Sequence, residues 1–256
     1  MASMSDSYPV KQWYSDPQKN GTYLCKVGEY WWLNPAYPEV RQLVADGVAE
    51  ILAQYHVDGI HLDDYFYPTT ETAFDAAAFA DAKADDLGAF RLEQVNAMVQ
   101  QIYSTVKAAS PAIQLSISPQ GTMDGNYTKQ YADVRRWGTE TGYCDVLIPQ
   151  LYYGFANETA PFAETLQTWT ETVSSESVSL VIGIGTMMPG LMRNAADGSI
   201  VHSSGTASLI GSHAALGYIV MGLLAFFLGV CVTVLLYRLH RRCEGQKQEE
   251  AGDGEL

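Results

Sequence analysis

Short apolar strands that alternate with amphipathic helices at an even step constrain this fold more than any other feature of the sequence. Three candidate strands begin at residues 113, 146 and 178, which are 33 and 32 residues apart. Strands separated by helices in this way form a parallel sheet of βα units, and a (β/α)8 barrel of about 250 residues repeats on this scale. We therefore predict an α/β fold, specifically a partial (β/α)8 TIM barrel.

Apolar periodicity divides this part of the chain into four helix–strand units. The helices are predicted over 38–55, 91–109, 127–140 and 162–173, and the strands over 59–65, 113–118, 146–152 and 178–184. A surplus stretch, 69–88, is expected to form an extended loop over the site, because long βα excursions tend to carry function. Its aspartates are expected to be solvated or to cap helices, and they are Asp75, Asp81, Asp85 and Asp86.

The first of these strands ends in a pair of acids. Because side chains alternate along a strand, His61, Asp63 and Tyr65 share one face. Catalytic groups of parallel barrels sit at the carboxyl ends of the strands, so Asp63 is the first candidate catalytic acid. Asp64 is the second candidate, and it faces the other way unless the strand already turns there. His61 and Tyr65 are predicted to line a sugar-binding pocket.

A structural interpretation of the same residues stays open. An acidic pair in a loop also forms a solvated turn that caps the next helix, and His61 is as consistent with a hydrogen-bonded core histidine. Asn34 is predicted to contact sugar or, as an alternative, to cap the helix that begins near Pro38. Asp124 is a candidate second acid on the same rim, with a cap ahead of Tyr127 as its alternative.

Two further strand ends carry amides, hydroxyls and aromatic rings. One closes in Ser116-Ile117-Ser118-Pro119-Gln120-Gly121, and the next closes in Ile148-Pro149-Gln150-Leu151-Tyr152-Tyr153-Gly154-Phe155. Amides and hydroxyls satisfy sugar hydroxyls, while flat rings cover the apolar faces of a pyranose. Gln120, Gln150 and Tyr152 are therefore predicted substrate-binding residues, although each motif taken alone is more often a structural turn. Asp145 stands at the opposite end of its strand and is predicted to be structural.

Charge and cysteine content exclude several classes of partner and site. The net charge of −14 argues against nucleic acid, which needs a basic footprint. The four cysteines show no metal-ligand spacing, so we predict no metal, no disulfide framework and no cofactor. The oligomeric state is not indicated by the sequence.

A long apolar segment near the carboxyl terminus predicts a membrane anchor. Residues 214–237 carry no charged side chain and are long enough to cross a hydrocarbon core of roughly 30 Å. Arg238, Arg241 and Arg242 follow, which predicts a single-pass protein with its amino-terminal domain outside and its carboxyl terminus in the cytosol. The predicted organisation is a barrel domain over 1–190, a linker over 191–213, the span over 214–237 and a disordered cytosolic tail over 238–256. The first residues show no secretory signal.

Four sequence motifs, taken in order, resemble the glycosyl hydrolase-like family 10, a bacterial group, over about residues 30–186. They are Trp32-Leu33-Asn34-Pro35 with Pro38-Glu39-Val40-Arg41, Val57-Asp58-Gly59-Ile60-His61-Leu62-Asp63-Asp64-Tyr65-Phe66-Tyr67-Pro68, Ile117-Ser118-Pro119-Gln120-Gly121, and Pro149-Gln150-Leu151-Tyr152-Tyr153-Gly154. The resemblance implies a TIM barrel that acts on a polysaccharide, with cell-wall glycan a target among relatives. Asp-Gly-Ile-x-Leu-Asp is also similar to the strand-four signature of the α-amylase group and to the chitinase-type signature, which implies a catalytic role for Asp63.

The sequence departs from that family pattern at both ends of the match. The first two or three barrel strands have no counterpart before Trp31, and a linker replaces the last βα unit after Thr186. We count four or five of eight strands, which leaves unpaired edges and indicates a truncated member, a fragment or a fusion to a membrane anchor. The predicted function is a glycoside hydrolase of a polysaccharide that uses carboxylate acid/base chemistry. The alternative is a non-catalytic carbohydrate-binding or membrane-anchored fragment. An aldolase-like barrel is not favoured, because the sequence lacks the catalytic lysine that such a barrel needs on a strand.

Overall fold

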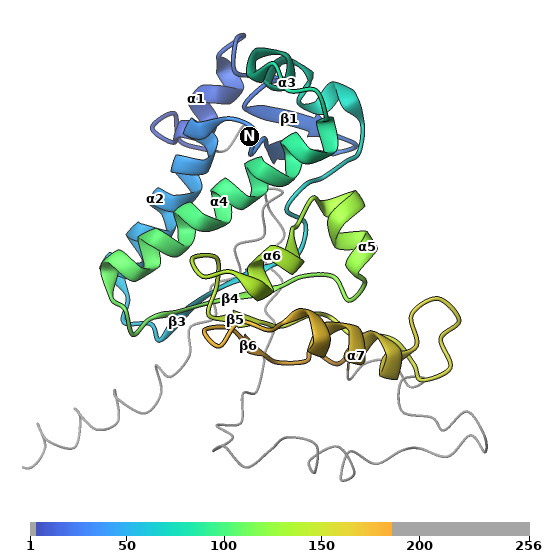
Figure 1. The fold of residues 1–256 in the computed structure, drawn as a ribbon. Coiled ribbons are helices and arrows are strands. Elements are labelled where there is room, and N and C mark those ends of the chain that lie inside the picture. The colour runs from blue at the N-terminus through green and yellow to red at the C-terminus, as the bar shows by residue number, and fades with distance from the viewer. Residues whose placement is uncertain (1–3, 186–256) are drawn as a thin grey trace, which may run out of the picture.

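A parallel four-stranded sheet lies at the base of the molecule in the computed structural model, which describes residues 4–185 (Figure 1). Its spatial order is β3-β4-β5-β6, with the bounds β3 (Gly59–Asp63), β4 (Gln114–Ser118), β5 (Val146–Leu147) and β6 (Ser179–Leu180). Strand order therefore follows chain order, as in the wall of a βα barrel, and the predicted α/β fold is confirmed. Within residues 4–185, β3 and β6 each pair with one neighbour, so closure into a barrel stays a prediction.

The apolar face of this sheet packs against one helix that precedes β3 and three helices that follow strands of the sheet. These are α2 (Pro38–Gln54), α4 (Leu87–Ala109), α6 (Val134–Thr139) and α7 (Phe162–Thr172). Val48, Val99, Trp137 and other helix residues form one buried core with strand residues such as Ile60 and Leu115. The residues that alternate with this buried set, among them His61 and Asp63, therefore face away from the helices.

An amino-terminal hairpin and helix precede the sheet and were not foreseen from the sequence. They are α1 (Pro9–Ser15), β1 (Leu24–Val27) and β2 (Tyr30–Leu33), with β1 and β2 antiparallel. Gly28 begins the two-residue turn with φ 61°, a left-handed value that suits tight hairpins. The aromatic run that ends at Leu33 is typical of a strand, and a glycine before such a run is typical of a tight turn. Val27-Gly28-Glu29-Tyr30 could therefore have indicated the hairpin.

The surplus stretch after β3 differs from the expected extended loop. It contains the 3₁₀ turn η1 (Thr72–Phe74) and the helix α3 (Ala76–Ala82), and α4 already begins at Leu87. Ala78 packs with Ala36 and Phe90, so α3 covers the start of α2 and α4 instead of the strand ends (Figure 1). Asp86 caps α4 by accepting from the Ala89 amide at 2.9 Å, as predicted for an acid of this stretch.

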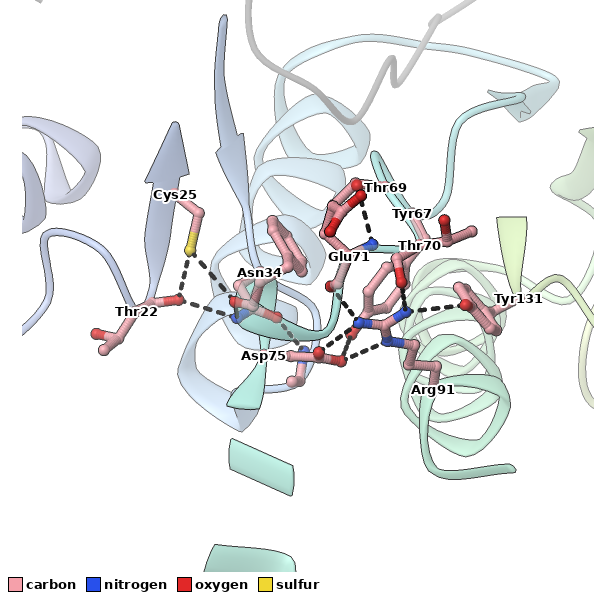
Figure 2. A network of polar contacts seen from close by, with 12 residues as sticks. Thr22, Cys25, Asn34, Tyr67, Thr69, Thr70, Glu71, Asp75, Arg91 and Tyr131 are labelled. Carbon is pink, nitrogen blue, oxygen red and sulfur yellow. Dashed lines mark hydrogen bonds and ion pairs between the residues drawn. The ribbon is translucent and has the colours of Figure 1, made fainter. Parts of the chain in front are cut away.

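Asp75 corrects the expectation that every acid of this stretch is solvated or a cap. Its side chain is fully buried and pairs with the equally buried Arg91 at 2.6 Å (Figure 2). A buried carboxylate needs a charged or hydrogen-bonding partner, and no sequence pattern indicated that Arg91 would be buried on α4. Asp75 therefore belongs to the core of the fold.

The continuous helix predicted over 127–140 is also wrong. The chain forms a short turn of helix, α5 (Met123–Gly125), then a π-helical turn, η2 (Asn126–Gln130), before α6 begins at Val134. Tyr131 ends the π turn with φ 51°, and the Asp133 side chain caps α6 by accepting from the Arg136 amide. Apolar periodicity alone does not reveal this break.

The predicted membrane anchor concerns a part of the chain that the structure does not describe. No helix within residues 4–185 combines the length and the apolar character needed to span a bilayer. The linker over 191–213, the apolar segment over 214–237 and the tail over 238–256 all lie outside the described residues.

Candidate active site

Asp63 meets Gln150 at the carboxyl edge of the sheet. The amide Nε2 of Gln150 donates to Asp63 Oδ1 at 2.7 Å, and it lies 3.2 Å from both the Oγ and the carbonyl oxygen of Ser118. Asp63 Oδ1 also accepts from the Asp64 amide at 2.9 Å. Parallel strands bring these residues together because their carboxyl ends share one edge of the sheet. The carboxylate of Asp63 is thus fixed by two donors.

A close backbone approach supports this meeting of strand ends. Gln150 forms parallel bridges with Gln120 on one side and Gly183 on the other, which continues the ladder beyond the regular strands. A Cβ atom on Gly121 would lie 2.5 Å from the Gln150 carbonyl oxygen and 2.5 Å from the Tyr153 ring. Only glycine leaves room there, so Gly121 allows Gln150 and Tyr153 to approach.

Asp64 lies at the same edge, although strict alternation predicts the opposite face. The strand ends at Asp63, and Tyr65 adopts φ 67°, so the chain is already turning at Asp64. The Asp64 side chain is 8% exposed, and its Oδ1 accepts from the Tyr65 amide at 2.7 Å. Burial raises the pKa of Asp64 to about 6, and the nearby Asp63 carboxyl raises it further, while hydrogen bonds from the Tyr65 amide and the Gln120 side chain oppose the shift.

Because folding raises the pKa of Asp64, ionisation of this carboxyl makes the protein less stable above about pH 6 than at about pH 4. A substitution that removes the charge should restore the lost stability. A carboxyl with a higher pKa in the folded state binds more protons there, so stability falls as pH rises from about 4 to about 6. We expect Asp64→Asn to raise the free energy of unfolding by roughly 2–3 kcal/mol at pH 7.5 and by little at pH 4. Urea unfolding at both pH values measures this. Asp81→Asn, which alters an exposed acid on α3, is the control, and equal behaviour of both variants would contradict the prediction.

His61 pairs with Ser116, a strand residue that was not among the predicted site residues. Its Nδ1 lies 2.8 Å from Ser116 Oγ, and that hydroxyl in turn donates to the Ile60 carbonyl oxygen at 3.4 Å. Burial lowers the pKa of His61, which the Asp63 charge only partly offsets, so the neutral ring is favoured at pH 7. Ser116 alternates with buried Leu115 and Ile117 on β4, and that spacing was the available signal.

Aromatic side chains border the two acids. Tyr65 is 56% exposed and Tyr152 is 42% exposed. Burial raises the pKa of Tyr152, and the charges of Asp63 and Asp64 raise it further. Burial and the Asp64 charge likewise raise the pKa of Tyr153, a residue that the sequence analysis did not select. Tyr152 and Tyr153 therefore lie close enough to the acids for the carboxylate charges to raise the pKa of their hydroxyls.

Asn34 does not belong to this edge, which corrects its predicted contact with sugar. It is fully buried, and its Nδ2 donates to the carbonyl oxygens of Thr22 and Phe74 at 3.0 and 3.2 Å. Its Oδ1 accepts from the Ala36 amide at 3.1 Å, just ahead of α2. Backbone groups therefore occupy the Asn34 side chain, and it does not cap α2 either, because the N-cap of α2 is Tyr37 and no side chain caps the helix.

The two other acids considered from the sequence also have clear places. Asp124 is exposed on α5, and its carbonyl oxygen accepts from the Thr128 hydroxyl at 2.6 Å. Asp145 accepts from Lys107 Nζ and from the Leu115 amide, both at 2.7 Å, which confirms a structural role at the amino-terminal end of the strands. Among the described residues, no group of three or more histidine, cysteine, aspartate or glutamate side chains is arranged to hold a metal ion.

Comparison with known proteins shows the family of this chain. The model of the family described as glycosyl hydrolase-like 10 matches residues 1–195, which is more than half of the chain. The chain belongs to the glycosyl hydrolase-like 10 family. The described sheet, the acid pair and the amides at the strand ends all lie inside the matched range.

Curated relatives of this glycosyl hydrolase-like 10 chain are named as glycosyl hydrolases. It is similar to "Glycosyl hydrolase YngK" of Bacillus subtilis (strain 168), with 29% identity over 201 residues that cover 70% of this chain and 38% of the relative. It is also similar to "Glycosyl hydrolase DigH" of Escherichia coli (strain K12), with 28% identity over 179 residues that cover 61% of this chain and 40% of the relative. The chain thus spans about two-fifths of the length of these relatives.

Proposed function

We propose that this chain hydrolyses glycosidic bonds of a polysaccharide, with Asp63 and Asp64 as the catalytic acids. The observation that carries the proposal is the contrast between the two carboxyl groups. Asp63 is held by Gln150 and the Asp64 amide, whereas Asp64 is buried with its pKa raised to about 6. Glycosidases need one protonated and one ionised carboxyl group, and environments that push two pKa values apart assign those roles.

In the proposed mechanism, Asp64 is the general acid that protonates the leaving oxygen. Asp63 is the carboxylate that activates water or attacks the anomeric carbon, and Gln150 holds its orientation. His61, neutral and held by Ser116, offers its free ring nitrogen to a sugar hydroxyl. The exposed rings of Tyr65 and Tyr152 supply flat surfaces for the apolar faces of the sugar.

Bacterial cell-wall glycan is the substrate that we propose to test first. The family membership and the printed names of the relatives support a carbohydrate substrate. The net charge of −14 supports a substrate other than nucleic acid. Gln150, which donates to Asp63, and Gln120, which contributes to the pKa of Asp64, offer amide donors and acceptors to a sugar.

The experiment measures release of reducing ends from purified cell-wall glycan by the full chain between pH 4 and 8. Asp64 donates a proton only while protonated, so we expect kcat/KM to fall about tenfold per unit as pH rises above about 6. Cellulose serves as the comparison polysaccharide. A flat profile from pH 6 to 8 would contradict Asp64 as the acid, and binding of glycan without any release would support the non-catalytic alternative.

We also propose that residues 214–237 anchor the chain in a membrane, with the catalytic domain outside and the tail in the cytosol. The uncharged run and the arginines that follow it support this proposal. Extraction of the expressed chain from membranes by alkaline carbonate tests it. Release into the supernatant would contradict a spanning segment.

A further inference from the structure

The buried Arg91 joins two loops near the acid pair. One follows β3 and carries Asp64, and the other follows β4 and carries Gln120. Arg91 on α4 is fully buried, and its Nε and Nη2 donate to the two carboxylate oxygens of Asp75 at 2.8 and 2.6 Å. Its remaining hydrogens go to the carbonyl oxygens of Thr70 and Glu71 and to the Tyr131 hydroxyl, at 3.1, 2.7 and 2.8 Å. All five N–H groups of the guanidinium are thus used.

The partners of Arg91 come from two different loops. Thr70, Glu71 and Asp75 belong to the loop that follows β3, while Tyr131 belongs to the loop that follows β4. Figure 2 shows the guanidinium between the Asp75 carboxylate and the Tyr131 hydroxyl. Its carbon also lies 4.9 Å from the centroid of the Tyr131 ring, within the range of a cation–π contact. Arg91 therefore fixes the separation of the two loops.

The β3 loop leads directly from this network to the acids. Tyr67, three residues beyond Asp64, donates its hydroxyl to Asp75 Oδ2 at 2.6 Å. Its ring lies 5.2 Å from the guanidinium carbon of Arg91 and is buried. Tyr65, which lies between Asp64 and Tyr67, takes a left-handed conformation. This conformation is uncommon for a tyrosine, so the surrounding structure must hold it.

The β4 loop leads from the same network to Gln120. The Asn126 side chain holds the loop to the backbone of Gln120. Its Nδ2 donates to the backbone carbonyl oxygen of Gln120 at 2.7 Å, and its Oδ1 accepts from the backbone N–H of Gln120 at 3.0 Å. The Asn126 carbonyl oxygen in turn accepts from the Ala132 amide at 2.9 Å, next to Tyr131. The Gln120 side chain is among the groups that lower the pKa of Asp64, so both loops lead from Arg91 to the surroundings of Asp64.

We propose that Arg91 is a positioning residue for the acid pair: by joining the loops after β3 and β4, it holds Gln120 against Asp64 and keeps water away from that carboxyl. The consequence for catalysis rests on the function proposed above, whereas the consequence for the Asp64 environment does not. A purely structural ion pair would stabilise the fold without setting the properties of Asp64.

The test compares single substitutions in the full chain. Tyr131→Phe removes the Arg91 acceptor on the β4 loop and keeps the ring, and Arg91→Lys removes the forked pairing with Asp75. Tyr103→Phe is the control, because it removes a tyrosine hydroxyl that contacts another acid–cation pair: Tyr103 donates to Asp145, which pairs with Lys107 at the opposite end of the strands. The titration of Asp64 is followed by NMR of ¹³C-labelled aspartate, with its signal assigned from Asp64→Asn.

We expect Tyr131→Phe and Arg91→Lys to lower the pKa of Asp64 from about 6 toward 3.8, because parted loops admit water to a carboxyl whose shift comes first from burial. The groups that face Asp64 and contribute to its titration, namely Asp63, Gln120, Tyr152 and Tyr153, are intact in both variants. We expect kcat to fall about tenfold with KM little changed, since misplaced catalytic groups lose rate first. Tyr103→Phe should alter neither quantity.

An unchanged Asp64 titration in folded Tyr131→Phe would overturn the proposal, whatever happens to activity. Should Arg91→Lys fail to fold, Tyr131→Phe alone decides the matter, because it retains the buried ion pair. A lowered pKa in a chain that releases no reducing ends would support the positioning role and sink the proposed function instead. The two ideas can therefore fail separately.

Discussion

Replacing Asp63 by asparagine should reduce the release of reducing ends by roughly a thousandfold, within the range observed for loss of a catalytic acid or base. Asparagine keeps the shape of the side chain and an oxygen that accepts from Gln150 and from the Asp64 amide. It removes the negative charge that the mechanism requires for activating water or attacking the sugar. We therefore expect kcat to carry the loss, with KM close to that of the wild type.

Asp58→Asn is the matched control for this experiment. Asp58 lies on the same stretch of chain, just before β3, and its side chain is exposed at the opposite end of the strand. Its replacement should leave reducing-end release unchanged. Equal activity of Asp63→Asn and Asp58→Asn would show that the edge formed by Asp63 and Gln150 does not perform the chemistry.

Replacing Asp75 by asparagine should lower the free energy of unfolding by about 3–5 kcal/mol, because it leaves the buried Arg91 without its counter-charge. The carboxylate accepts three hydrogen bonds, two from Arg91 and one from the Tyr67 hydroxyl, and asparagine offers a single oxygen in its place. Replacing a charged hydrogen-bond partner with a neutral amide at a fully buried position is among the costliest of single changes.

Urea unfolding of the full chain measures this effect, with Glu93→Gln as the control. Glu93 also pairs with an arginine, Arg136, at 2.8 Å, but its side chain is 59% exposed. Exposed pairs of this kind contribute about 0–1 kcal/mol. A loss for Asp75→Asn that matches the loss for Glu93→Gln would mean that the buried network stabilises the fold no more than a surface pair.

The parallel sheet was predictable because its determinants are local and periodic. Amphipathic spacing gave α2 and α7 to within one residue at each end, and apolar alternation identified β3 and β4. The alternation also set His61 and Asp63 on one face, away from the helices. The meeting of Asp63 with Gln150 followed from the carboxyl ends of parallel strands sharing an edge.

The rest depended on contacts between distant segments. Arg91 looks like an ordinary charged residue near the start of a helix, and only the return of the loop after β3 buries it beside Asp75. Asn34 was misassigned because its partners, the carbonyl oxygens of Thr22 and Phe74, are brought near by the hairpin and η1. Asp64 turned toward the edge because Tyr65 takes a left-handed conformation that strand alternation does not foresee.

Hydrolysis of cell-wall glycan in H₂¹⁸O, followed by mass spectrometry of the products, tests whether Asp63 and Asp64 cleave glycosidic bonds. We expect each new reducing end produced by the full chain to carry one ¹⁸O atom, and Asp63→Asn to produce almost none. Glycan that is bound by the full chain yet recovered uncut, without incorporated label, would contradict this expectation.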